Sequence, residues 1–165
     1  MNIKCLAAVS ALAIGLVSSG AWAQSVPSTT FDVTITIQST CNIAAQAADD
    51  VDFGAHPSTA TDIEADGMLY VSCTELTPYN IQLNEGLLGT SVSDRAMAGP
   101  EGAEVPYQLY RDAARTQVWG QTIGTDTLSS VGTGDVQNHP VHGLVPSANF
   151  PAGDYVDTVT ATVVW

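Results

Sequence analysis

The chain has 165 residues and carries 17 acidic against four basic side chains, a net charge of −13. A surface of this sign repels nucleic-acid phosphates and anionic lipids, so the composition argues against nucleic-acid binding and against attraction to an anionic membrane surface. The length is typical of one domain with a core of its own.

The first 23 residues have the pattern of a secretory signal peptide. Lys4 supplies a positive start, an apolar run covers 5–17, and Ala21-Trp22-Ala23 forms a small-x-small cleavage site. Cleavage would leave 142 residues, 24–165, with three arginines against seventeen acidic residues and a net charge of −14. No other stretch is apolar and long enough to span a bilayer, so we expect no membrane insertion of the mature chain.

The mature chain retains two cysteines, Cys41 and Cys73. An even pair in an exported protein predicts a disulfide, which for about 30 intervening residues would stabilise the fold by roughly 3–4 kcal/mol. Two free thiols or half of a metal site are the alternatives. Without a CxxC motif or a nearby histidine ligand, the pair makes a poor zinc site.

The first predicted strand begins close to the mature N-terminus, in the stretch FDVTITIQSTC at 31–41. Apolar and polar residues alternate with a period of two, which indicates a strand with one buried face. The apolar face comprises Phe31, Val33, Ile35 and Ile37.

Seven further runs resemble strands and are separated by Gly, Pro, Asp, Asn and Ser. They cover 51–54, 68–75, 79–86, 105–112, 117–120, 141–146 and 154–165. Two Gly-rich stretches, 86–104 and 122–135, are expected to be loops, the first with a short strand. The pattern predicts an all-β fold, an antiparallel β-sandwich. The last run ends at Trp165, so an immunoglobulin-like sandwich built from these runs would lack its final strand and expose an apolar groove.

The search for catalytic motifs finds no GxSxG, no phosphate-binding loop and no HExxH, so we expect neither an enzyme nor a cofactor. His139 and His142 lie three apart, which places them on opposite faces of a strand and disfavours a shared metal. We expect both to be surface or loop residues, and His56, before a proline, to lie in a loop.

The best cation candidate is DIEADG at 62–67, whose acidic first, third and fifth positions and sixth-position glycine resemble the start of a calcium loop. The twelfth position is Cys73 instead of a bidentate glutamate. We therefore expect an acidic turn before a strand, and weak cation binding at Asp62–Asp66 stays open. Four aromatic residues could line a ligand cleft but are expected in the core: Tyr107, Tyr110, Trp119 and Tyr155.

These residues together resemble the spore coat protein U domain family, whose members include subunits of archaic (Csu-type) chaperone–usher pili. The matching elements are the alternating strand followed by Cys41, VDFG, VSCT, PYQLYRDAARTQVWG, VHGLVP and AGDYVDTVTATVVW, which span almost all of 31–165. By position, the family-motif residues are Gly54, Tyr107, Leu109, Tyr110, Arg111, Asp112, Trp119, Gly143, Gly153, Tyr155, Asp157 and Thr158.

The resemblance implies an incomplete immunoglobulin-like fold at 39–165 that an N-terminal donor strand of a neighbouring subunit completes. The donor extension would be 24–38, with Phe31, Val33, Ile35 and Ile37 as the side chains that contact the neighbour. The implied partners are like subunits in a head-to-tail polymer, a periplasmic chaperone and an outer-membrane usher, and the protein would be exported to a surface pilus that serves adhesion or biofilm formation. A self-complemented, monomeric secreted or coat-type surface protein remains the alternative.

Overall fold

The computed structural model describes residues 26–44 and 49–165. The predicted signal peptide, 1–23, lies outside the described residues. Residues 26–40 form no strand or helix in the single chain, and regular pairing begins only at Cys41. Of the strand expected over 31–41, only Cys41 is part of a strand here, because residues 31–40 pair with no other strand among the described residues.

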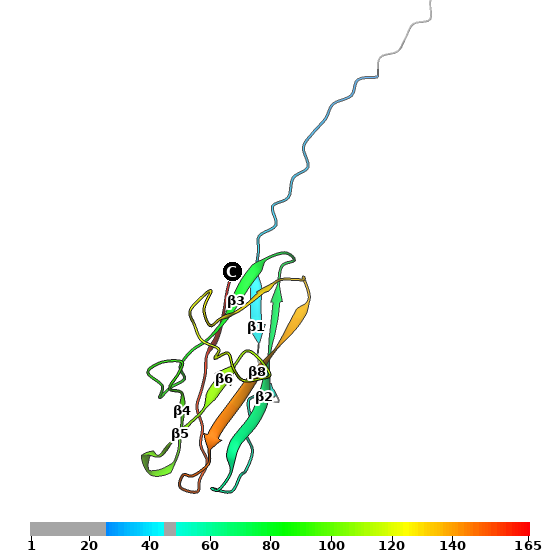
Figure 1. Cartoon of the computed structure of the whole chain (residues 1–165). Helices are drawn as coiled ribbons and strands as arrows, with labels where there is room; N and C mark the ends of the chain where they lie inside the picture. The colour runs from blue at the N-terminus through cyan, green and yellow to red at the C-terminus, as the bar shows by residue number, and fades with distance from the viewer. Residues whose placement is uncertain (1–25, 45–48) are drawn as a thin grey trace, which may run out of the picture. The chain divides into compact units, whose positions relative to one another are not determined.

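One sheet holds four antiparallel strands in the order β1-β2-β8-β6. They are β1 (Cys41–Ala44), β2 (Thr61–Cys73), β8 (Val136–Ser147) and β6 (Gln108–Tyr110). The long pair β2 and β8 forms its centre, with Thr61 opposite Ser147 and Ser72 opposite Val136 (Figure 1).

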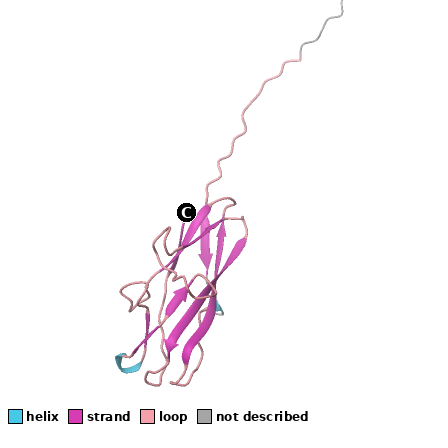
Figure 2. Cartoon of the chain, viewed as in Figure 1, coloured by secondary structure: helices cyan, strands magenta, loops and turns pink. Residues whose placement is uncertain are grey.

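The second sheet has the order β7-β3-β9, with β7 (Leu128–Val131), β3 (Pro78–Leu83) and β9 (Ala161–Val164). A separate hairpin joins β4 (Ala96–Ala98) to β5 (Glu104–Pro106), with the short 3-10 turn η2 (Pro100–Gly102) between them. Val156, ahead of β9, bridges to Ala98 of this hairpin. Figure 2 shows that strands and loops make up nearly all of the fold.

The core lies between the two main sheets and follows the period of two along each strand. Alternate residues of β2 and β3 point inward and are at most 7% exposed. These are Ile63, Leu69, Val71 and Cys73 from β2 and Tyr79, Ile81 and Leu83 from β3. Trp119 is fully buried and donates its indole N–H to the carbonyl of Ile81, 2.9 Å away.

Several local predictions are wrong. The segment at 51–54 forms no strand, and 62–67 is part of β2 instead of a turn. In that segment Ile63 points into the core while the acidic residues occupy the outer face, where a distant arginine pairs with them. The run at 117–120 contributes one bridge, from Val118 to Tyr110.

The prediction for two of the histidines is also wrong. His139 and His142 lie on opposite faces of β8, as expected, but both are only 8% exposed. His139 points inward, and its Nε2 lies 2.8 Å from the hydroxyl of Tyr79 on the other sheet. His142 points outward, and its Nδ1 lies 2.8 Å from Asp66. His56 lies in an exposed loop, as predicted.

Candidate subunit-binding groove

The free edge of β9 forms one wall of a groove between the sheets. On the paired side, the amide of Asn84 donates to the carbonyl of Thr160 over 3.1 Å. Antiparallel pairing alternates, so the peptide groups of Val159, Ala161 and Val163 face the other side. No strand among residues 26–44 and 49–165 pairs with that side of β9. Toward these described residues, the edge therefore presents donors and acceptors without a strand partner.

The inward face of the segment that ends in β9 is only half-buried. Its apolar side chains pack against the core without being covered, whereas those of the neighbouring strand β3 are at most 3% exposed. The half-buried set comprises Tyr155, Val159, Ala161 and Val163. The sandwich thus has an apolar face that this part of the chain leaves open.

The opposite wall is the extended segment that contains Val51 and Phe53, which lies directly on the first sheet. A Cβ atom on Gly143 would lie 2.5 Å from Cγ1 of Val51 and 2.8 Å from the Phe53 ring. A Cβ atom on Gly67 would meet Val51 in the same way, at 2.8 Å from Cγ2. The two glycines therefore allow this wall to pack against the sheet, and Phe53 meets the edge of the Tyr107 ring at 6.5 Å between centroids.

Two cavities occupy the space between the walls. The first has a volume of about 540 Å³ and extends along the inner face from Ala161 to Tyr155. The second, of about 760 Å³, continues past Tyr155 to the turn at 150–154. Apolar side chains form much of both linings: Leu69, Leu83, Leu109, Val141 and Val159 in the first, and Ile63, Val105, Val145 and Phe150 in the second.

At its other end the groove closes near the point where the leader joins the domain. There β1 approaches β9, and the indole N–H of Trp165 donates to the carbonyl of Ser39 at 3.4 Å. Cys41 lies directly opposite Cys73 in the ladder between β1 and β2, and the two are disulfide-bonded. The predicted disulfide is confirmed, and it fixes β1 to the sheet where the leader begins.

Within the groove, Asp157 is the one acidic residue on the inner face of β9 and its lead-in, and its carboxylate is fully engaged. Its oxygens accept hydrogen bonds from the hydroxyl of Tyr107 at 2.7 Å and from the amides of Leu87 and Thr158, both at 2.8 Å. Burial, together with the bond to Asp157, raises the pKa of Tyr107 well above its usual range. The hydroxyl therefore stays a donor, and Asp157 requires no further polar partner.

The four predicted donor residues expose their apolar side chains to solvent, in contrast to the half-buried apolar lining of the groove. Phe31, Val33, Ile35 and Ile37 are 77–86% exposed in the single chain. Large apolar side chains of one strand face with this exposure leave a substantial apolar surface in water, which in soluble proteins marks an interaction site.

A sequence model of the Spore Coat Protein U domain family matches residues 28–162. The chain belongs to this family. It is 36% identical over 111 residues to Protein U of Myxococcus xanthus, a match that covers 63% of this chain and 62% of that protein.

Among solved structures, the family's fold is matched in the crystal structure of the CsuC–CsuE chaperone–tip adhesion subunit pre-assembly complex from the archaic chaperone–usher Csu pili of Acinetobacter baumannii. The similarity has a TM-score of 0.56 at 26% identity and covers 79% of this chain and 40% of that chain. The chain spans less than two thirds of either relative. The fold is accordingly an incomplete, immunoglobulin-like antiparallel β-sandwich.

The Tyr-x-Leu-Tyr-Arg-Asp run at 107–112 organises a loop beside β6. The Arg111 guanidinium donates to the carbonyls of Thr125 and Thr127, and Asp112 accepts bonds from Thr116 and the amide of Gln117. Burial works to raise the pKa of Asp112, but these hydrogen bonds outweigh it and hold the pKa below its ordinary value. The motif is therefore structural and holds the 111–117 loop in place.

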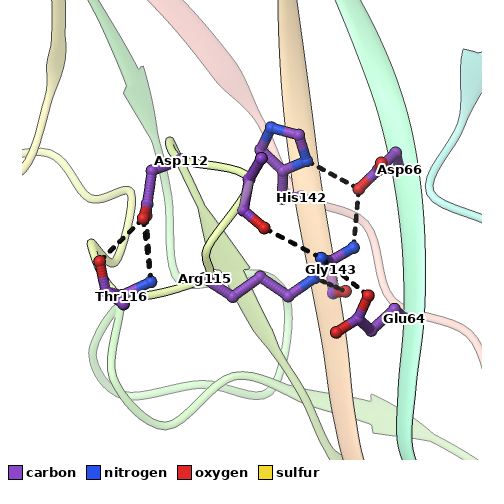
Figure 3. Close-up of polar contacts among 8 residues, drawn as sticks. Glu64, Asp66, Asp112, Arg115, Thr116, His142 and Gly143 are labelled. Atoms are coloured by element: carbon purple, nitrogen blue, oxygen red, sulfur yellow. Dashed lines mark hydrogen bonds and ion pairs between the residues drawn. The ribbon is translucent and has the colours of Figure 1, made fainter.

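The same loop anchors the outer face of the first sheet through Arg115. Its guanidinium lies 2.9 Å from both Glu64 and Asp66, and its Nε donates to the carbonyl of Gly143 at 3.0 Å (Figure 3). His142 contacts the same Asp66 oxygen. This outer cluster explains why the acidic run at 62–67 can be a strand.

Arg95 is the residue that sequence reasoning missed. It is completely buried and donates to the carbonyls of Leu83, Asn84 and Trp119 and to the Gln108 side chain. Burial lowers the pKa of Arg95. It lies in the Gly-rich stretch 86–104, expected to be a loop. The one signal in the sequence is its position directly before the short apolar run AMA at 96–98.

Most of the remaining residues that the sequence predicts as motif positions shape turns or pack in the core. Gly54 has a φ of +72°, which glycine adopts without strain, and its amide is capped by Asp52. Gly153 lies against Pro100, where a Cβ atom would come within 2.6 Å of the ring. Leu109 and Trp119 are buried core residues, whereas Tyr110 is half-buried and Thr158 is exposed. Of the four aromatic residues, Tyr107 and Tyr155 line the groove as well as packing on the core.

In the part of the chain that the structure describes, no helix is both long and apolar enough to cross a membrane. The same residues contain no group of three or more His, Cys, Asp or Glu side chains placed to hold a metal ion.

Proposed function

We propose that this protein is a structural, non-enzymatic subunit of a surface pilus, polymerised by donor-strand complementation in a chaperone–usher pathway. Residues 24–38 act as the donor extension and 39–165 as the acceptor domain. The observation that carries the proposal is the pairing of an open apolar groove beside the free edge of β9 with an exposed, alternating apolar strand in the leader. The similarity to a chain of the Csu chaperone–subunit complex supports it.

The positions of the two features favour a neighbour as the source of the strand. The leader joins the domain at Ser39, which lies at the Trp165 end of the groove. A neighbour whose own body lies beyond the opposite end, near 150–154, can insert its leader without meeting the recipient's leader. That donor strand runs antiparallel to β9, whereas a strand folded back from Ser39 would run parallel to it.

Complementation supplies a large driving force. Burying four large apolar side chains is worth roughly 1.5–3 kcal/mol each, on the order of 6–12 kcal/mol before the cost of ordering the leader. A ladder along the free edge of β9 adds hydrogen bonds that the domain cannot make alone. The resulting joint would dissociate slowly, because separation requires the completed fold to open.

The proposed contact joins two different surfaces, the leader of one copy and the groove of the next, so repetition builds an open fibre. The similarity to the Csu chaperone–subunit complex supports the other partners. A periplasmic chaperone would cover the groove before assembly, and an outer-membrane usher would secrete the fibre, which would serve adhesion or biofilm formation.

The test is denaturing gel electrophoresis of natively secreted protein, with half of the sample unheated and half boiled. We expect a ladder in the unheated lane that collapses to one band on boiling. A single monomer band in both lanes would reject the pilus proposal in favour of a self-closed surface protein.

A chain that begins at Ser39 separates these alternatives further. A pilus subunit of this length should still fold when a chaperone or a peptide covering 24–40 is supplied, because its own leader is not part of its core. A self-closed protein would lose one of its own strands in this truncation and should unfold.

A further inference from the structure

We propose that Ala161 sets the register of the inserted strand by accepting Phe31 of a second copy of this chain. The inference rests on the proposed function and specifies which residue of the neighbour occupies which part of the groove. In this register Phe31 lies opposite Ala161, Val33 opposite Val159, Ile35 opposite Asp157 and Ile37 opposite Tyr155.

The apolar face of the donor and the inner face of β9 match in length. The apolar face of the donor runs from residue 31 to residue 37, and the lining of the first cavity along the inner face of β9 runs from Tyr155 to Ala161. Both spans cover six residue steps, or about 20 Å at 3.3 Å per residue. Val163 lines neither cavity, and β1 approaches β9 at that end. A register advanced by two residues would place Phe31 there and leave the Tyr155 level unfilled.

The side chains of Ala161 and Phe31 are complementary in size. Ala161 has the smallest side chain of the inward-facing set on this segment, and Phe31 has the largest side chain of the donor face. Ala161 pairs with Leu83 in the sheet, and Leu69 lines the same cavity from the other sheet. A phenyl ring above Ala161 would therefore contact two buried leucines, whereas any larger residue at 161 would occupy its place.

The inward faces of the two strands also agree in this register. Odd-numbered residues of β9 point inward and also direct their peptide groups to the free edge. Directly opposed residues of an antiparallel pair share a face, so the apolar, odd-numbered donor residues point inward only where they lie opposite odd-numbered residues of β9. The donor's polar residues, Asp32, Thr34 and Thr36, then face solvent. Asp157 tolerates Ile35 opposite it, because Tyr107 and Leu87 already satisfy its carboxylate.

A size exchange within the full mature chain tests the register, since every subunit carries both a leader and a groove. Ala161→Phe should reduce the heat-sensitive ladder by about tenfold or more, because the overpacked site excludes Phe31. The double variant Ala161→Phe/Phe31→Ala should restore most of it. Ala161→Phe/Val33→Ala is the matched control and should not.

The outcomes separate the register from the proposed function. If the wild-type protein forms no ladder, both proposals fail. If the wild type forms a ladder but Val33→Ala is the change that rescues Ala161→Phe, the register is wrong and donor-strand assembly stands. A ladder from Ala161→Phe alone that equals the wild type also overturns the role of Ala161.

A second measurement covers the case in which Ala161→Phe fails to fold. Opposed residues in an antiparallel ladder have Cα atoms about 4.5–5.5 Å apart, within the range of a disulfide. The variant Phe31→Cys/Ala161→Cys should therefore form covalent multimers that withstand boiling without reductant. Multimers from Val33→Cys/Ala161→Cys instead would overturn the register.

Discussion

Replacement of Ile35 by aspartate should abolish polymerisation without weakening the folded monomer. In the single chain Ile35 is 85% exposed, so Ile35→Asp should change the free energy of unfolding by no more than about 0.5 kcal/mol. In a neighbour's groove the change loses roughly 1.5–3 kcal/mol of apolar burial and adds several kcal/mol for a desolvated carboxylate. A total on the order of 5 kcal/mol weakens the joint by about three orders of magnitude or more. The proposed register adds repulsion from Asp157.

The matched control is Thr36→Asp, which adds the same charge to the solvent face of the same strand. Thermal unfolding of the monomer fraction and the unheated gel ladder should be measured for both variants. We expect equal melting temperatures and a ladder only from Thr36→Asp. A lowered melting temperature for Ile35→Asp monomer would refute the reasoning, because it would show that the side chain belongs to the core of its own chain.

The remaining predictions concern stability. Cys73→Ser should lower the free energy of unfolding in urea by about 2–4 kcal/mol, and an unchanged value would remove the disulfide as a source of stability. Burial lowers the pKa of His139 from 6.5, so the unfolded chain takes up a proton first and the free energy of unfolding should fall as pH drops below about 6.5. It should level off below the pKa of the folded state, and His139→Gln should flatten this part of the profile. Arg95→Met leaves buried carbonyls without a donor and should cost about 3 kcal/mol or more; retention of wild-type stability in urea would contradict the contacts described. Gly143→Ala forces a methyl group against Val51 and should lower the melting temperature, and a rise would show that this wall of the groove yields.

The periodicity of the strands could be predicted from the sequence because burial imposes it directly. The inward faces of β2 and β3 and the alternation from Tyr155 to Val163 all follow from a period of two. The cysteine pair was predictable for a different reason, since an exported chain with two cysteines has few alternatives.

Features that depend on distant partners could not be predicted. The sequence predicts a turn for the acidic run at 62–67, because it does not show that Arg115, some fifty positions away, pairs with Glu64 and Asp66 on its outer face. The sequence predicts a surface position for His139, because it does not show that Tyr79 of the other sheet provides a buried hydrogen-bond partner. Arg95 donates hydrogen bonds to carbonyl groups that only the tertiary fold brings close together.

The groove itself was only partly predictable. The missing final strand follows from the order of the predicted strands. The second wall could not be predicted, because Val51 and Phe53 form no ladder with a strand. They pack against the first sheet only because Gly67 and Gly143 have no side chains there. The sequence reading treated Gly143 as part of a motif, without the contact that explains it.

The basic side chains of the predicted mature chain have a practical consequence for chemical labelling, because all three are arginines and guanidinium groups do not react with amine-reactive dyes. Arg95, Arg111 and Arg115 each bind carbonyl groups, Arg115 also pairs with two carboxylates, and the sequence beyond residue 23 contains no lysine. A chain cleaved after Ala23, as the sequence predicts, therefore carries one primary amine, at the tip of the leader. An amine-reactive dye would label each subunit at this single site, so its fluorescence would count the subunits in a fibre.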